Sequence, residues 1–116
     1  MKATYWQKGE VLDFTPTADV KNGQVVPIGS RVGVAGSDIA ANEQGHLHVV
    51  GVFEMDKAAN EAITMGAALY YDATNDCVTA TASTGEGAAK VDNTPAGYAV
   101  APAAAAATTV LVKLLG

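Results

Sequence analysis

Three side chains in this sequence could in principle do chemistry: His46, His48 and Cys77. The two histidines alternate along an apolar run that predicts a strand, so they share one strand face and could chelate a metal. A metal site needs at least one further ligand, and the nearest carboxylates, Glu43 and Glu54, follow no matching pattern. We therefore interpret the pair as solvent-facing histidines on a half-buried strand, and we predict no metal and no cofactor.

The single cysteine excludes an internal disulfide. It follows the turn signal Asn75-Asp76 and has no histidine or cationic neighbour in sequence, so we interpret Cys77 as a small hydrophobic residue. The run Gly85–Lys90 hints at a phosphate-binding loop, but its spacing is wrong and Val91, which has no hydroxyl, follows the lysine. No Gly-x-Ser-x-Gly elbow is present. We assign no catalytic residue and predict that the chain is not an enzyme.

Composition narrows the remaining functions. The chain has 116 residues, 49% hydrophobic, and a net charge of −5. Its seven cationic residues are scattered, whereas nucleic-acid binding needs clustered cations, so we predict no nucleic-acid partner. No apolar stretch approaches the roughly 20 residues that span a bilayer, and the start lacks the apolar segment of a signal peptide. We therefore expect no membrane association and no export through an N-terminal signal.

Short apolar runs between turn signals predict an all-β fold, either a small β-barrel or a β-sandwich of eight or nine short strands. Met55–Ile63 has mild helical character, so we expect at most one short helix. Pro27 argues for an edge strand, since proline lacks a backbone N–H. We expect Ser83–Asn93 to form an exposed loop with a short strand near Ala89–Val91, and Ala103–Ala107 to form a connection. The other predicted strands are Glu10–Phe14, Gln24–Ile28, Arg31–Ala35, His46–Glu54, Leu69–Asp72, Cys77–Ala82, Ala96–Ala101 and Thr108–Leu115.

Two units are expected along the chain, an N-terminal arm at residues 1–9 and a single β-barrel domain at residues 10–116. The arm contains the adjacent aromatic pair Tyr5 and Trp6, which includes the only tryptophan. One interpretation places one ring under the first strand and the other on the rim. The other makes the arm a docking segment, because tryptophan and tyrosine are favoured anchors at protein interfaces.

Several segments, taken in order, resemble the tailed-phage capsid cement (decoration) protein family. The first is Tyr5-x-x-x-Gly9 followed by Glu10–Phe14, and the last is the final strand to Leu114. Between them come Val26-Pro27-Ile28-Gly29 with Val32–Ala35, Gly45 to Gly51 with Val52–Met55 and Lys57, Gly66–Asp72, and Gly97-Tyr98-Ala99. The match covers nearly the whole chain. Some relatives are labelled recombinases of the RecA or RadA type, but this chain lacks the phosphate-binding loop of such an ATPase.

The resemblance implies a small, tulip-like β-domain on the outside of an assembled phage or prophage head. There the protein would bridge neighbouring major capsid subunits after its synthesis in the cytoplasm of a host bacterium. The family carries no catalytic residues over to this chain. We expect a homo-oligomer, favour a trimer, and name Tyr5 and Trp6 as candidate capsid contacts.

Two other functions stay open at this stage. One is a small ligand-binding β-module, such as a carbohydrate-binding module, which exposed aromatic residues along a groove would favour. The other is an enzyme or metalloprotein that uses His46, His48 and Cys77.

Overall fold

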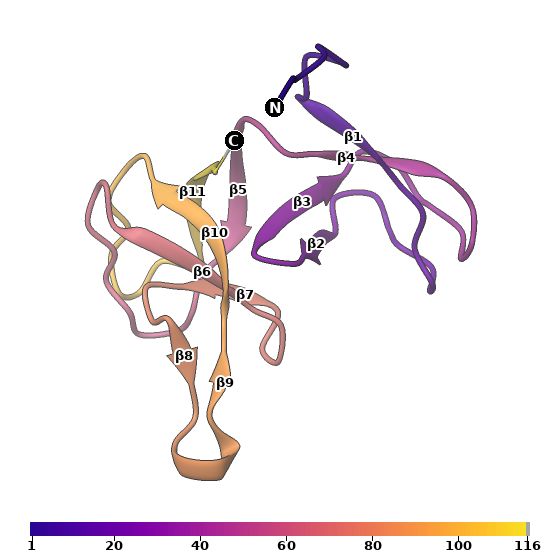
Figure 1. Ribbon diagram of the computed structural model, residues 1–116. Coiled ribbons are helices and arrows are strands. Elements are labelled where there is room, and N and C mark those ends of the chain that lie inside the picture. The colour runs from indigo at the N-terminus through magenta and orange to yellow at the C-terminus, as the bar shows by residue number, and fades with distance from the viewer. Residues whose placement is uncertain (116) are drawn as a thin grey trace.

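The computed structural model describes residues 1–115 and is all-β, as predicted (Figure 1). It has eleven strands and one 3-10 turn, η1 (Gly87–Ala89). The strands are β1 (Val11–Phe14), β2 (Val25–Ile28), β3 (Arg31–Ala35), β4 (Gly45–His48), β5 (Val52–Asp56), β6 (Ala68–Asp72), β7 (Cys77–Thr79), β8 (Ser83–Thr84), β9 (Val91–Asp92), β10 (Thr94–Ala99) and β11 (Thr109–Leu114).

The strands form two larger antiparallel sheets and one small ribbon. The first sheet has the order β1-β4-β3-β2, the second β5-β11-β10-β6-β7, and β8 pairs with β9. Pro27 lies on β2, an edge strand, as predicted. In the described residues the second sheet does not close into a barrel, but one parallel bridge between Lys57 and Val78 links its two edges.

Strand β3 joins the two sheets because both of its faces are buried. Val32 and Val34 point into the core of the second sheet, together with residues such as Val112 of β11. On the opposite face, Ala35 packs in a second core with Leu47 of β4. Successive side chains of a strand alternate between its faces, so five consecutive residues can serve two cores.

Two predictions for the middle of the chain are wrong. The run expected as one strand, His46–Glu54, is divided between β4 and β5, which belong to different sheets. The chain bends at Gly51, whose φ of 128° is one that residues with a side chain rarely adopt. The helical character expected for Met55–Ile63 is also absent, since β5 continues to Asp56 and Ile63 forms a bridge with Ala103.

The segment Ser83–Asn93, predicted as an exposed loop with one short strand near Ala89–Val91, has a strand at Val91–Asp92 and a second one at Ser83–Thr84. Strands β8 and β9 pair as Ser83 with Asp92 and Thr84 with Val91, and η1 closes the tip. This β8–β9 finger projects below the second sheet in Figure 1. The finger and the division of the central strand explain why the structure has more strands than expected.

Two elements of the second sheet match their predictions closely. The hairpin formed by β6 and β7 pairs Tyr71 with Val78 across the turn at residues 73–76. The final strand buries Val110, Val112 and Leu114 on one face, as their alternation predicts.

Gly97 of β10 should be essential for the contact between β10 and β11. A Cβ added there would lie 1.8 Å from the backbone oxygen of Lys113, and a backbone oxygen cannot swing aside as a side chain can. We expect Gly97→Ala to lower the free energy of unfolding by about 3 kcal/mol or more, measured by urea denaturation.

The matched control is Gly66→Ala, where an added Cβ meets nothing within 4 Å and only the cost of a positive φ, +85°, remains. That cost is about 1 kcal/mol. Equal losses in the two variants would contradict the close packing of β10 on β11.

Candidate docking arm and adjoining hollows

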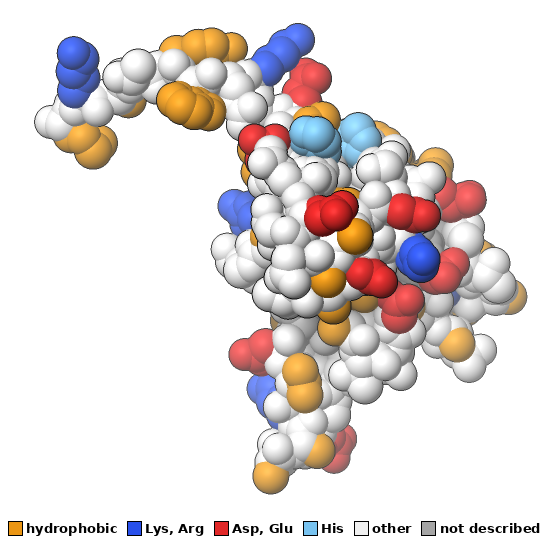
Figure 2. All heavy atoms as spheres, turned by 90° about the vertical axis from the view of Figure 1, so that its right-hand side faces the viewer, with side chains coloured by type: hydrophobic (Ala, Val, Ile, Leu, Met, Phe, Trp, Pro, Cys, Tyr) orange, Lys and Arg blue, Asp and Glu red, His pale blue; other side chains and the backbone are white. Residues whose placement is uncertain are grey.

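The N-terminal arm, residues 1–9, has no regular secondary structure and leaves the body of the protein. Figure 2 shows it as a narrow extension at the level where Figure 1 places the N-terminus. Tyr5 is 83% exposed and Trp6 is 89% exposed, so neither ring packs under the first strand. Both aromatic side chains are therefore almost completely in contact with solvent.

The base of the arm is fixed by the pairing of β1 with β4. Val11 lies opposite His48, and the backbone N–H of Val49 donates to the oxygen of Glu10 over 3.0 Å. Gly9, with a φ of +82°, turns the chain immediately before this point, in a conformation that suits glycine. The first residues held by backbone hydrogen bonds to β4 and the segment after it therefore come directly after the arm.

The two histidines lie on β4, at the upper edge of the body in Figure 2. His46 is exposed, and its Nε2 lies 3.4 Å from Oδ1 of Asp13 on the paired strand. His48 is half-buried, with its ring centroid 6.3 Å from that of Phe53. No group of three potential metal ligands occurs within residues 1–115.

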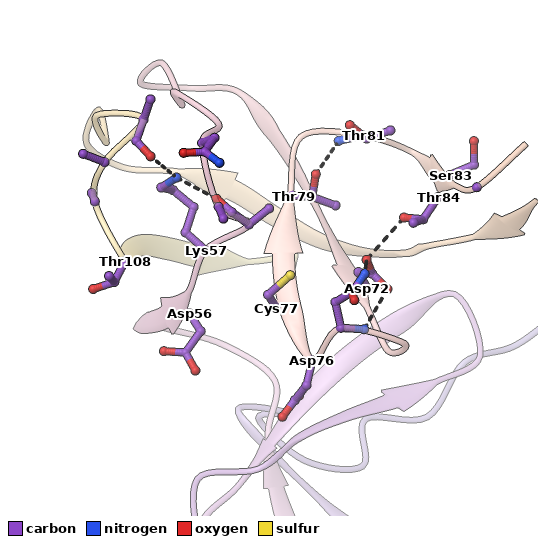
Figure 3. Close-up of a pocket in the computed structure, with 18 residues that line it drawn as sticks. Asp56, Lys57, Asp72, Asp76, Cys77, Thr79, Thr81, Ser83, Thr84 and Thr108 are labelled. Atoms are coloured by element: carbon purple, nitrogen blue, oxygen red, sulfur yellow. Dashed lines mark hydrogen bonds between the residues drawn. The ribbon is translucent and has the colours of Figure 1, made fainter.

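A hollow of about 860 Å³ lies between the β6–β7 turn, the base of the finger and the Ala105–Thr108 segment (Figure 3). Asp72 lines it and is 4% exposed. Its Oδ1 accepts from the backbone N–H groups of Thr74 (3.0 Å) and Asn75 (3.2 Å). Its Oδ2 accepts from the side chains of Asn75 (2.7 Å) and Thr84 (3.3 Å), so Asp72 connects the turn to the finger.

The hydrogen bonds to Asp72 stabilise its charged form. The Asn75 side chain contributes most, and together with the backbone N–H groups it holds the pKa of Asp72 below the ordinary 3.8, despite the opposing effect of burial. This carboxylate is fully engaged in holding the turn and the finger, so its role in the hollow is structural.

Cys77 and Tyr71 lie beside the same turn in an environment that suppresses ionisation. Burial, and then the nearby carboxylates of Asp72 and Asp76, raises the pKa of the Cys77 thiol. Burial and the hydrogen bond that the Tyr71 hydroxyl donates to Asp76 (2.7 Å) raise the pKa of Tyr71. A thiol that stays protonated is a poor nucleophile, which agrees with the interpretation of Cys77 as a packing residue.

The most unusual side chain of this region is the buried Lys57, which belongs to the family resemblance but to which the sequence assigned no role. It is 6% exposed, and its Nζ donates to the backbone oxygens of Ala58 (2.8 Å), Glu61 (2.5 Å) and Ala105 (3.4 Å). The ammonium group therefore fastens the Ala103–Ala107 connection to the segment that follows β5. A lone lysine after a strand looks like any surface lysine in sequence, so only the fold reveals its role.

Replacing Lys57 by methionine should destabilise the fold. The variant keeps a side chain of similar length but removes the charged donor of three backbone carbonyl oxygens, and hydrogen bonds to a charged group contribute about 1.5–3 kcal/mol. We expect Lys57→Met to lower the free energy of unfolding by about that amount in urea denaturation. Lys90→Met, on the exposed finger, is the control and should change it by less than about 0.5 kcal/mol. A Lys57→Met variant as stable as the control would refute the fastening role.

The Asp72 carboxylate predicts a pH dependence of stability. Because its pKa is lowered on folding, its contribution is complete above the ordinary value of 3.8 and is lost as pH falls through the lower folded value. Asp72→Asn should therefore be less stable than the wild type at pH 7, and the two proteins should converge once the pH falls below the lowered pKa of Asp72 in the folded protein. Thermal unfolding between about pH 2 and pH 7 measures this, and a constant difference across the whole range would contradict it.

The helices of the described structure include none long and apolar enough to cross a membrane. Comparison with protein families matches residues 6–114 to a family described as phage cement protein. Comparison with curated proteins finds no match. Comparison with solved structures also finds none.

Proposed function

The chain belongs to the phage cement protein family, and on that premise we propose that it binds the outside of an assembled head. There it bridges neighbouring major capsid subunits and stabilises the shell against the pressure of packaged DNA. The protein is made in the cytoplasm of the bacterial host and ends in the virion of a phage or prophage.

The observation that carries this proposal is the N-terminal arm. It presents Tyr5 and Trp6 almost completely to solvent, while the first paired strand begins only at Val11. An extended arm with free backbone N–H and C=O groups can add a strand to an exposed sheet edge of a partner. The aromatic rings then supply anchors of the type that dominates interface energies. We propose that Tyr5 and Trp6 are the capsid contacts.

Oligomerisation would multiply a single weak contact. A homotrimer with three arms makes several attachments to the shell at once, and linked contacts gain about 10²–10⁴ over a single one. We propose a trimer on this ground, in which each arm engages a different capsid subunit.

A non-catalytic role agrees with the chemistry of the body. The buried polar side chains Lys57 and Asp72 are engaged in holding turns and connections, and the thiol of Cys77 is kept protonated. A structural family and groups occupied in this way support our proposal that the protein acts by binding alone. The carbohydrate alternative gains no support from the hollow beside the β6–β7 turn, because its lining in the described structure contains no aromatic side chain for a sugar ring.

Removing residues 2–8 should abolish binding to heads while leaving the fold intact, since these residues belong to no strand and are exposed. The double variant Tyr5→Ala/Trp6→Ala should weaken binding at least about tenfold, because interface aromatics often contribute about 2 kcal/mol or more. Co-sedimentation with purified expanded heads measures both, and circular dichroism confirms the fold.

Met65→Ala provides the control, because Met65 is a large exposed apolar residue of the body, away from the arm. It should bind like the wild type. Unchanged co-sedimentation of the arm deletion would show that the arm is not the attachment, and a loss in all variants alike would point to non-specific hydrophobic binding.

A further inference from the structure

A second hollow of about 490 Å³ forms a groove where the first sheet meets the second. Residues of β2, β3, β5 and β7 line it. Val25 and Phe53 are only partly buried there, so their apolar surface is left for an occupant. The acidic side chains in its lining are Glu54, Asp56 and Asp76, all of them exposed. The groove therefore combines apolar walls with an acidic rim.

This groove continues into the larger hollow. The two share Asp56, Asp76 and Cys77 in their linings, and Figure 3 shows these three side chains along one side of the larger hollow. The depression is consequently long enough for an extended segment rather than for a compact ligand alone. Its occupant should be apolar on one side and positively charged.

The arm of this protein has that chemistry. Residues 1–9 contain Lys2 and Lys8 together with Tyr5 and Trp6, and they contain no acidic residue. Since the whole chain carries −5 and the arm contributes +2, the remaining residues carry −7. The charges of the chain are thus divided between a basic, aromatic arm and an acidic body, and opposite potentials guide such surfaces together.

The arm does not fold back onto its own body. Its residues are exposed apart from the half-buried Gly9, and Gly9 turns the chain outward from β1. Nine residues in extended form reach about 30 Å, enough to cross to a neighbouring molecule. A groove and a complementary segment that do not meet within one chain can meet between two.

We propose that the arm of one copy docks in this groove of a second copy. Tyr5 and Trp6 cover the apolar surface of Val25 and Phe53, and the arm lysines lie against the acidic rim. The arm and the groove are different surfaces, so the contact is head-to-tail, and such contacts close into rings when the rotation permits. This exchange of arms between copies holds the oligomer of the free protein together. During assembly, the capsid competes with the groove for the same arm.

The only tryptophan of the chain lies in the arm, so intrinsic fluorescence reports the docking directly. In the full-length free protein, we expect Trp6 emission to move to shorter wavelength as concentration rises, in step with an increase in mass by sedimentation velocity. A shift that does not depend on concentration would mean that the arm binds its own groove. A constant emission of an exposed tryptophan, or a monomer at every concentration, would also overturn the proposal.

Charge-reversal variants test whether the arm lysines contact the acidic rim of the groove, as we propose. Glu54→Lys in the groove and Lys8→Glu in the arm should each weaken self-association at least about tenfold, as the loss of a close charge pair at an interface does. An equimolar mixture of these two variants should recover it, because the carboxylate introduced into the arm of one variant then meets the ammonium group introduced into the groove of the other. Glu86→Lys at the exposed finger tip is the matched control and should associate like the wild type.

Failure of the mixture to recover association, or equal effects of Glu54→Lys and Glu86→Lys, would overturn the assignment of the groove. If Glu54→Lys failed to fold, Lys8→Glu alone would still test the proposal, because Lys8 lies outside the body. The proposal requires Lys8→Glu to weaken self-association, and unchanged association would overturn it. No capsid is present in these measurements. A negative result in these self-association measurements therefore does not contradict the proposed attachment to heads. A negative result in the co-sedimentation with heads likewise does not contradict the groove proposal.

Discussion

The burial of β3 on both faces is the constraint on which the rest of this structure depends. Val32 and Val34 complete the core of the second sheet, while Ala35 and its neighbours complete the core of the first. Gly33 lies tightly on the second face, because a Cβ there would lie 3.0 Å from the Cβ of Leu47, which would have to shift to admit it. Without β3 the second sheet would lose most of its contact with the first, and small sheets of mostly Ala and Val bury little area by themselves.

The junction made by β3 also positions the surfaces available for binding. The groove lies where the two sheets meet, and β4, which pairs with β3, fixes β1 and thereby the base of the arm. The buried polar groups serve the same framework, since Lys57 fastens a connection and Asp72 fastens the finger. What this framework leaves free is an exposed basic arm and an acidic, partly apolar depression, both suited to protein contacts.

Much of this fold could be predicted from the sequence because local signals and tertiary packing agree. The alternation of Val110, Val112 and Leu114 predicted a strand with one buried face, and Pro27 predicted an edge strand. The apolar run His46–Glu54 led to the wrong prediction of a single strand. It supplies two strands to two sheets, and only the positive φ of Gly51 marks the division. Only one strand of the finger was predicted, near Ala89–Val91, where β9 lies; β8 was missed because it is two residues long and carries no apolar alternation. The candidate site divides in the same way. The sequence left open whether Tyr5 and Trp6 pack under the first strand or are exposed, and the structure shows both exposed. The docking role assigned to them stays a prediction. The groove could not be anticipated, because its walls come together only through the contact between sheets. The role of Lys57 depends on carbonyl oxygens from residues 58, 61 and 105, which no local pattern connects.

If this protein strengthens an assembled shell by binding to it, the effect is measurable on the shell itself. The most direct measurement heats DNA-filled heads of a phage that encodes the chain, with and without saturating protein, and follows DNA release with a dye. We predict that decorated heads release their DNA at a higher temperature than bare heads. Release at the same temperature, with the protein demonstrably bound, would contradict the proposed stabilising role.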